Sequence, residues 1–139
     1  MSKAEPTVQK FMTTQPYTID AGSPLKEALK MMEDHQIRHL PVTHEGKLSG
    51  ILSDRDIRTA LGFQGTSPET TRVADVCHEH PYSTTPDHPL SEVAEEMAEK
   101  HYGSALVVQN GKLVGIFTTV DACRAIAWIL KQRFHEHGN

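Results

Sequence analysis

The sequence predicts a mixed α+β fold made of two β-α-β-β-α repeats that pack with pseudo-twofold symmetry. Three observations lead to this prediction. Matching residues recur at a constant offset of 65 positions, each copy contains an apolar pattern with helical spacing, and each contains two short apolar runs joined by a tight turn. We expect repeat 1 over residues 8–62, a linker over 63–72 and repeat 2 over 73–130, with its last helix extending to about residue 136.

The duplication is visible in pairs of identical residues. The pairs include Pro16-Tyr17 with Pro81-Tyr82, Glu27 with Glu92, Met32 with Met97, Gly46-Lys47-Leu48 with Gly111-Lys112-Leu113, Gly50-Ile51 with Gly115-Ile116, and Asp56 with Asp121. One register holds without a gap from Val8/Val73 to Ala60/Ala125. A copy of roughly 55 residues buries little surface on its own, so we expect the two copies to close a core together.

The elements of the first copy follow from local patterns. Tyr17–Ile19 is a short strand candidate, and Ser23-Pro24 suits the N-cap and first turn of a helix. The helix then presents one apolar face through Leu25, Ala28, Leu29 and Met32. A hairpin is expected from the runs 39–43 and 48–53 around Glu45-Gly46, and a last helix from near Asp54.

The second copy repeats this order. Leu90, Val93, Ala94 and Met97 form the apolar helix face, and Asn110-Gly111 is a favoured tight-turn dipeptide. Its last helix, from near Thr119, is apolar on almost every side. Since a small core covers only one side of a helix, we expect the other side, including Trp128, to meet a second copy of the chain, giving a homodimer. The alternative is a helix that wraps the other half of its own chain.

Bulk composition excludes several classes of function. The net charge of −4 disfavours sequence-independent nucleic-acid binding, which needs a basic surface. The sequence contains no run of 18 apolar residues, so we expect no membrane span. Residues 1–9 do not resemble a signal peptide. Cys77 and Cys123 form no disulfide framework, so we expect a reducing, cytoplasmic location.

Three segments of the duplicated pattern resemble the cystathionine-β-synthase-type (CBS) domain. They are Ile37–Val42, Gly50–Asp56 and Gly115–Asp121. The resemblance covers nearly the whole chain, which is identified as a tandem CBS pair. It implies a regulatory sensor, not an enzyme, that binds adenosine-containing ligands in clefts between the repeats and controls a partner protein that the sequence does not name.

Each copy contains Gly-x-x-(Ser/Thr)-x-x-Asp at an expected strand-to-helix junction. A helix N-terminus favours phosphate, the hydroxyl can donate to a phosphate oxygen, and the aspartate can accept from both ribose hydroxyls. Backbone groups of each first strand would read the adenine edge. The expected ligand residues are Thr18, Ile19, Arg38, His39, Pro41, Ser53, Arg55 and Asp56 in the first copy, and Ser83, Thr84, Ser104, Thr118 and Asp121 in the second.

The two expected sites differ in charge. Arg38 and Arg55 suit phosphate in the first site, whereas the second has Gly103-Ser104 and Val120 at these positions. We therefore expect the second site to be weaker, less selective for phosphate, or empty. AMP, ADP or ATP, with or without magnesium, is the expected ligand; S-adenosylmethionine and NAD remain alternatives because they also carry adenosine. No cofactor is expected to be required.

Other interpretations stay open. Ser-x-x-Asp and Thr-x-x-Asp also resemble helix capping boxes, so the chain could be an interaction module without a ligand. The histidine pairs in 78–80 and 135–137 and the two cysteines permit a metal or redox sensor, although their spacing disfavours zinc. No nucleophile or Walker motif supports an enzyme.

Overall fold

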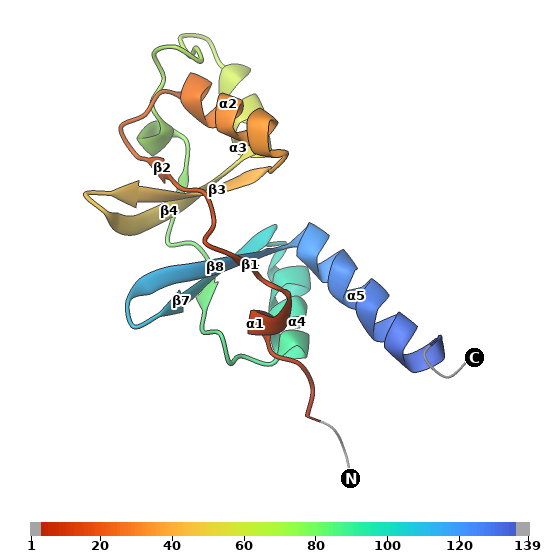
Figure 1. Cartoon of the computed structure of the whole chain (residues 1–139). Coiled ribbons are helices and arrows are strands. Elements are labelled where there is room, and N and C mark those ends of the chain that lie inside the picture. The colour runs from red at the N-terminus through yellow and green to blue at the C-terminus, as the bar shows by residue number, and fades with distance from the viewer. Residues whose placement is uncertain (1–3, 136–139) are drawn as a thin grey trace. The chain divides into compact units, whose positions relative to one another are not determined.

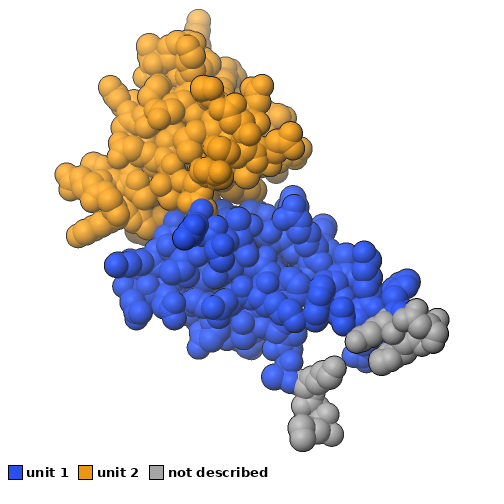
Figure 2. All heavy atoms as spheres, viewed as in Figure 1, with its two compact units in different colours: residues 1–15, 82–139 blue, residues 16–81 orange. Residues whose placement is uncertain are grey.

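The computed structural model describes residues 4–135, which form two compact units (Figures 1 and 2). Unit 2 is Pro16–Pro81, and unit 1 combines the described residues up to Gln15 with those from Tyr82 onward. Each unit contains a four-stranded sheet and packed helices. The predicted mixed α+β fold with two repeats is confirmed.

Unit 2 contains the predicted strand-helix-strand-strand-helix order. Its elements are β2 (Ile19–Asp20), α2 (Leu25–His35), β3 (His39–His44), β4 (Lys47–Ser53), α3 (Asp54–Leu61), the 3₁₀ turn η1 (Val73–Asp75) and β5 (His78–Glu79). The sheet order is β2-β3-β4-β5, with β2 parallel to β3 and the other pairs antiparallel. The first strand begins at Ile19, two residues later than predicted.

Unit 1 has the same arrangement. Its elements are α1 (Val8–Phe11), β1 (Thr13–Thr14), β6 (Ser83–Thr84), α4 (Leu90–Lys100), β7 (Ser104–Gln109), β8 (Lys112–Thr118) and α5 (Thr119–Phe134). The sheet order is β1-β8-β7-β6. Residue 136, where we expected the last helix to end, lies outside the described residues, as does His137 of the second histidine pair.

One edge strand of each sheet comes from an unexpected part of the sequence. β5 follows the linker and pairs with β4, although by sequence it opens the second repeat. In the same way β1 opens the first repeat but pairs with β8. The chain therefore passes from one unit to the other after Gln15 and again after Pro81. Each sheet is completed by the opening segment of the other repeat.

The start of each amphipathic helix corrects one prediction. Ser23 does not cap α2; the N-cap is Pro24, which makes no side-chain cap hydrogen bond, and Pro89 has this role in α4. The first N–H group of each helix instead donates to a backbone carbonyl of the segment just before a repeat. Leu25 N–H donates to Thr71 O at 2.9 Å, and Leu90 N–H donates to Pro6 O at 3.0 Å.

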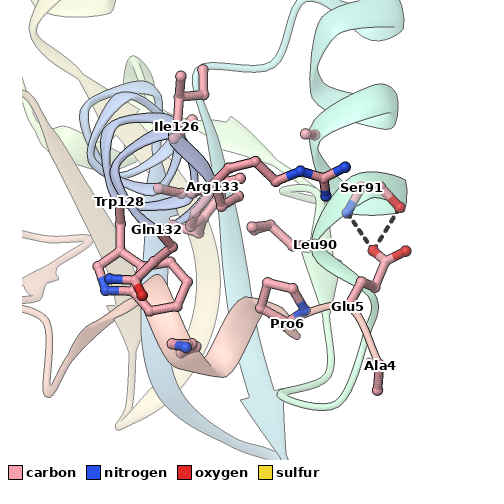
Figure 3. Close-up of a pocket in the computed structure, with 15 residues that line it drawn as sticks. Ala4, Glu5, Pro6, Leu90, Ser91, Ile126, Trp128, Gln132 and Arg133 are labelled. Atoms are coloured by element: carbon pink, nitrogen blue, oxygen red, sulfur yellow. Dashed lines mark hydrogen bonds between the residues drawn. The ribbon is translucent and has the colours of Figure 1, made fainter. Parts of the chain in front are cut away.

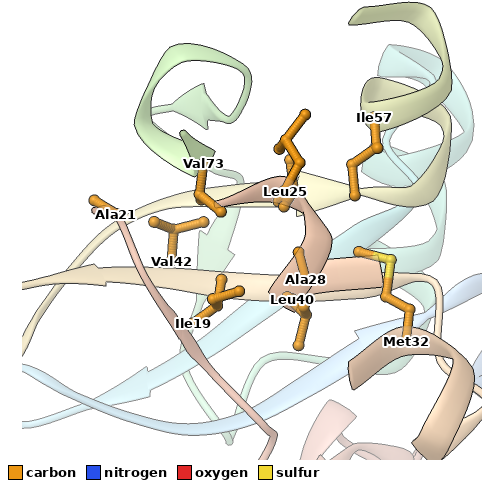
Figure 4. Close-up of a cluster of buried hydrophobic side chains, with 10 residues drawn as sticks. Ile19, Ala21, Leu25, Ala28, Met32, Leu40, Val42, Ile57 and Val73 are labelled. Atoms are coloured by element: carbon orange, nitrogen blue, oxygen red, sulfur yellow. The ribbon is translucent and has the colours of Figure 1, made fainter. Parts of the chain in front are cut away.

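The buried side chains form a separate apolar core in each unit. In unit 2 the core joins the inner face of α2 to the sheet, α3 and η1 (Figure 4); it contains Ile19, Ala21, Leu25, Ala28, Met32, Leu40, Val42, Leu52, Ile57 and Val73. In unit 1 the core contains Val8, Leu90, Val93, Met97, Ala105, Val107, Phe117 and Ala125. The predicted helix faces thus supply much of both cores, but Ala94 is exposed.

Both predicted hairpin turns are present. Glu45 and Gly46 have φ of 53° and 79°, and Asn110 and Gly111 have φ of 53° and 76°. Two consecutive positive φ values are typical of the type I′ turn, whose twist matches that of the joined strands. Within residues 4–135 no helix is both long and apolar enough to cross a membrane.

Candidate functional site

The predicted motif of unit 2 lies where β4 ends and α3 begins. Ser53 Oγ accepts a hydrogen bond from the Asp56 N–H at 3.0 Å, and Asp56 Oδ2 accepts one from the Ser53 N–H, also at 3.0 Å. These reciprocal bonds form a capping box with aspartate in place of the usual glutamate. The structural interpretation of Ser-x-x-Asp is therefore correct, and it leaves the carboxylate half-buried at a helix N-terminus.

The motif of unit 1 has equivalent geometry between β8 and α5. Thr118 Oγ1 accepts from the Asp121 N–H at 3.5 Å, and Asp121 Oδ2 accepts from the Thr118 N–H at 2.9 Å. Asp121 is only 3% exposed. Its Oδ1 atom also lies 3.5 Å from a guanidinium nitrogen of Arg124. An acid in the first turn is further favoured by the helix dipole.

Each aspartate has a second partner that sequence reasoning missed. His78 Nε2 lies 2.9 Å from Asp56 Oδ1, and Thr13 Oγ1 donates to Asp121 Oδ1 at 3.2 Å. His78 and Thr13 occupy the same position of the repeat, 65 residues apart, on edge strands β5 and β1. The offset of 65 residues between the repeats could have aligned His78 with Thr13. It does not show, however, which unit the opening segment of a repeat joins.

The glycine of the motif allows the edge strand to approach. A Cβ atom on Gly50 would lie 2.6 Å from His78 O, and one on Gly115 would lie 2.5 Å from Met12 Sδ. Both glycines are buried. Gly, Ser/Thr and Asp in the motif thus act together: the glycine admits the edge strand, and the aspartate then binds a side chain from it.

The other predicted residues of unit 2 gather at the same end of its sheet. His39 pairs with Ser53, and the Asp54 N–H donates to Arg38 O at 2.8 Å. β2 runs parallel to β3 with Ile19 opposite Val42, which brings Thr18 to the level of Pro41. Arg38, Arg55 and Thr18 are exposed, His39 is half-buried, and Pro41 is buried.

Unit 1 gathers its predicted residues in the same way. Ser104 pairs with Thr118, and Ser83 lies opposite Leu106. Ser104 and Thr84 are buried, and the Thr84 hydroxyl forms a hydrogen bond with Nδ1 of His88. The Thr84 side chain is therefore engaged within unit 1.

Burial and neighbouring charges shift two pKa values in unit 2. Burial lowers the pKa of His39, an effect that the nearby carboxylates of Asp56 and Asp54 oppose and Arg38 reinforces. Burial and the charge of Glu79 raise the pKa of the Cys77 thiol, which keeps this thiol protonated and poorly reactive. Among residues 4–135 no group of three His, Cys, Asp or Glu side chains is arranged to hold a metal ion.

A hollow of about 1060 Å³ lies elsewhere in unit 1, between the N-terminal segment, α4 and α5 (Figure 3). Its lining includes Leu90, Ile126, Trp128 and Ile129, and none of the thirteen predicted ligand residues. Glu5 lies at its edge, where its carboxylate accepts hydrogen bonds from the Ser91 backbone N–H and hydroxyl at 3.0 and 2.6 Å. The predicted ligand sites and this apolar hollow are thus different regions.

Two units with the same sheet order and the same aspartate-capped helix define a tandem repeat module. The family model for the CBS domain matches residues 8–62 and 73–127, so the chain belongs to the CBS-domain family and carries two copies. The chain is 31% identical over 115 residues to the CBS domain-containing protein YhcV of Bacillus subtilis, covering 83% of this chain and 81% of YhcV.

Solved structures extend the comparison. The AcuB protein of Vibrio cholerae, described as an acetoin utilization protein, has a TM-score of 0.82 at 32% identity and covers 96% of this chain and 99% of its own. The CBS domain pair of MJ0100, in complex with 5′-methylthioadenosine and S-adenosyl-L-methionine, also has a TM-score of 0.82, at 27% identity over 91% of this chain and 99% of its own. CBSX2 in complex with AMP has a TM-score of 0.75 at 25% identity, covering 89% and 98%.

Proposed function

We propose that this protein is a regulatory sensor that binds an adenosine-containing ligand at the aspartate motif of each unit. AMP, ADP or ATP is the proposed ligand. The alternatives are S-adenosylmethionine, 5′-methylthioadenosine and NAD. The observation that carries the proposal is the matched placement of Asp56 and Asp121, each at a helix N-terminus beside a hydroxyl. One similar CBS structure holds AMP, and another holds 5′-methylthioadenosine and S-adenosyl-L-methionine, which supports the same ligand class here.

The Asp56 carboxylate retains the capacity to bind ribose. An ionised carboxylate has about four lone-pair positions. In unit 2 the Ser53 N–H uses one on Oδ2 and His78 uses one on Oδ1. The remaining positions can accept from both ribose hydroxyls, while backbone groups near Thr18-Ile19 read the adenine edge. The Ser53 hydroxyl and the N-terminus of α3 would face the 5′ substituent.

Charge distinguishes the two proposed sites. Arg38 and Arg55 are exposed around the motif of unit 2, where each can pair with a phosphate. The matching positions of unit 1 are Gly103-Ser104 and Val120. We therefore assign AMP, ADP or ATP preferentially to unit 2, and an uncharged or weakly bound adenosyl ligand to unit 1. Magnesium would accompany only the polyphosphate ligands.

The proposed output is a change in protein partners. A ligand that binds one arrangement of the chain better than another shifts the population toward it and alters the surface offered to a regulated protein. Homodimerisation is the second proposed association, through α4 and α5. Exposed apolar side chains on α5, with exposed fractions from 38% to 71%, support it; they are Val120, Ile126, Trp128, Ile129, Leu130 and Phe134.

Mass spectrometry of small molecules released from the natively purified protein tests the ligand class. The proposal expects an adenosine compound, and addition of that compound at a hundred times its dissociation constant should raise the unfolding free energy by about 2.7 kcal/mol. No thermal shift with AMP, ADP, ATP, S-adenosylmethionine or NAD would favour the rival, a ligand-free interaction module whose motifs act only as helix caps.

A further inference from the structure

The aspartate of each motif is held by a side chain from an edge strand. Asp56 contacts His78 of β5, and Asp121 contacts Thr13 of β1. The contacts are equivalent in two respects: the N-cap N–H binds Oδ2 of the aspartate, and the edge-strand residue binds Oδ1. Two donors on different oxygens fix the rotation of a carboxylate, and hence the direction of its remaining lone pairs.

The two edge-strand side chains differ in chemistry. Histidine changes its charge between about pH 5 and 8, whereas a threonine hydroxyl does not ionise in this range. The His78 side chain is 70% exposed and therefore accessible to protons from solvent, while the Asp56 side chain that it contacts is 19% exposed. A proton gained by His78 thus places a positive charge directly against the carboxylate of unit 2.

We propose that His78 and Thr13 are positioning residues for the ribose-binding aspartates, and that His78 makes adenosine binding in unit 2 weaken as the pH falls. This inference rests on the proposed function. An imidazolium forms a charge-assisted hydrogen bond with Oδ1, which is shorter and stronger than a neutral one. The carboxylate is then partly neutralised, and a ribose hydroxyl gains less from it. Unit 1, with Thr13, binds adenosine with little dependence on pH.

Other charged groups lie on the elements around His78, and substitution of His78 alone distinguishes its effect from theirs. On α3, Asp54 is paired with Arg58 at 2.9 Å. β4 places Gly50 and Ile51 opposite β5, and neither titrates. At the start of β3, burial lowers the pKa of His39, so His39 gains charge at a lower pH than an ordinary histidine. The other charged or titratable residues on these elements are Arg38 just before β3, Arg55 on α3, and Asp75, Glu79 and His80 along the segment of β5.

The test measures binding of 5′-methylthioadenosine, which has no phosphate whose own titration would obscure the result. Amide chemical shifts of Asp56 and Asp121 in the ¹⁵N-labelled full chain report the two units separately. Between about pH 8 and pH 5.5 the dissociation constant in unit 2 should rise about fivefold, the size expected for the difference between a neutral and a charge-assisted hydrogen bond. The dissociation constant in unit 1 should change less than about twofold.

Two variants separate positioning from mere folding. His78→Gln keeps an uncharged N–H donor, so unit 2 should bind at both pH values as the parent does near pH 8. Thr13→His should transfer the pH dependence to unit 1. His44→Gln, at the exposed end of β3, removes a histidine remote from the motif and should leave the parent profile unchanged.

The outcomes distinguish this inference from the function on which it rests. Saturable binding with the same pH profile in the parent and His78→Gln overturns the role of His78 and leaves the ligand assignment intact. Stronger binding in unit 2 at the lower pH also overturns it. If no amide shift saturates in either unit at about pH 8, methylthioadenosine does not bind; this contradicts the inference, and AMP then tests the proposed function separately.

Discussion

Oδ1 of Asp56 lies 2.9 Å from Nε2 of His78, although 22 residues separate the two in the sequence. The contact joins the helix that follows one repeat's hairpin to the strand that opens the next repeat. It ties the capping aspartate of unit 2 to the edge of its own sheet. Thr13 and Asp121 provide the same connection in unit 1. Stability and the proposed ligand site therefore depend on the same carboxylates.

Loss of the Ser53 hydroxyl should destabilise the ligand-free protein. Ser53→Ala removes the acceptor for the Asp56 N–H at the start of α3, and such caps contribute about 1 kcal/mol. Urea unfolding checks the free energy. Thr59→Ala, at an exposed position inside the same helix, is the matched control and should cause no loss, because alanine is the better helix former. Equal stability of the two variants would show that the cap contributes nothing.

Substitution of the two motif glycines should have unequal effects. Gly50→Ala forces a Cβ to within 2.6 Å of a backbone carbonyl of β5, and we expect a loss of about 2–3 kcal/mol as the strand is displaced. Gly115→Ala meets the flexible Met12 side chain first and should cost less. Thermal unfolding compares both with Gly62→Ala at the exposed end of α3. A loss at Gly115 as large as that at Gly50 would contradict this explanation.

The lowered pKa of His39 predicts a stability change in acid. The folded state binds the His39 proton less readily than the unfolded chain, in which the pKa is about 6.5. The stabilising contribution of neutral His39 is complete above about pH 6.5 and is lost as the pH falls toward the lower folded-state pKa. In urea unfolding at several pH values, His39→Asn should reduce the decline, whereas His44→Asn should not. An unchanged decline in His39→Asn would refute the assignment.

Phosphate preference should follow the arginines. Arg55→Val, which places in unit 2 the residue found in unit 1, should weaken AMP binding there about tenfold and leave methylthioadenosine binding nearly unchanged. Val120→Arg should strengthen AMP binding in unit 1. Calorimetric titration with both ligands checks the difference. Equal losses for AMP and methylthioadenosine would mean that Arg55 acts through the fold and does not contact phosphate.

The apolar surface of α5 should control association. Ile126 is 57% exposed and lines the hollow of unit 1, so Ile126→Glu should shift a homodimer toward the monomer by burying an unpaired charge. Analytical ultracentrifugation measures the equilibrium. Lys112→Glu, on the β7–β8 hairpin, also introduces a negative charge, but it lies outside this surface and should leave association unchanged. A parent protein that is monomeric at high concentration would contradict the homodimer.

Local sequence signals predicted most of the fold. The spacing of Leu25, Ala28 and Met32 identified the buried face of α2, and Asn110-Gly111 identified a type I′ turn, because both depend on neighbouring residues. The N-cap of α2 was predicted one residue too early, at Ser23, since the partner of the Leu25 N–H is a carbonyl of Thr71, far away in the sequence. A serine just before a helix resembles an N-cap in the sequence, whether or not a carbonyl from another segment already accepts the first N–H groups of that helix.

The sequence also predicted the motif residues of the candidate site, but not their partners on the edge strands. The duplicated Gly-x-x-(Ser/Thr)-x-x-Asp pattern identified both capped helices, because capping needs only residues within one turn. His78 and Thr13 escaped notice because they reach the aspartates through strand pairing of the opening segments. In the sequence, His78 was weighed only as part of a metal or redox sensor. The repeat offset aligned it with Thr13, but only the fold shows that both contact an aspartate.

Equilibrium binding of AMP to the parent, Asp56→Ala and Asp121→Ala, resolved by unit through amide chemical shifts, tests the central claim most directly. We predict saturable binding in the parent. Asp56→Ala should weaken binding in unit 2 at least about tenfold and leave unit 1 little changed, and Asp121→Ala should do the reverse, as expected when a buried acceptor for ligand hydroxyls is lost. Binding of AMP to both variants with the affinity of the parent would contradict the assignment of these carboxylates as the ligand sites.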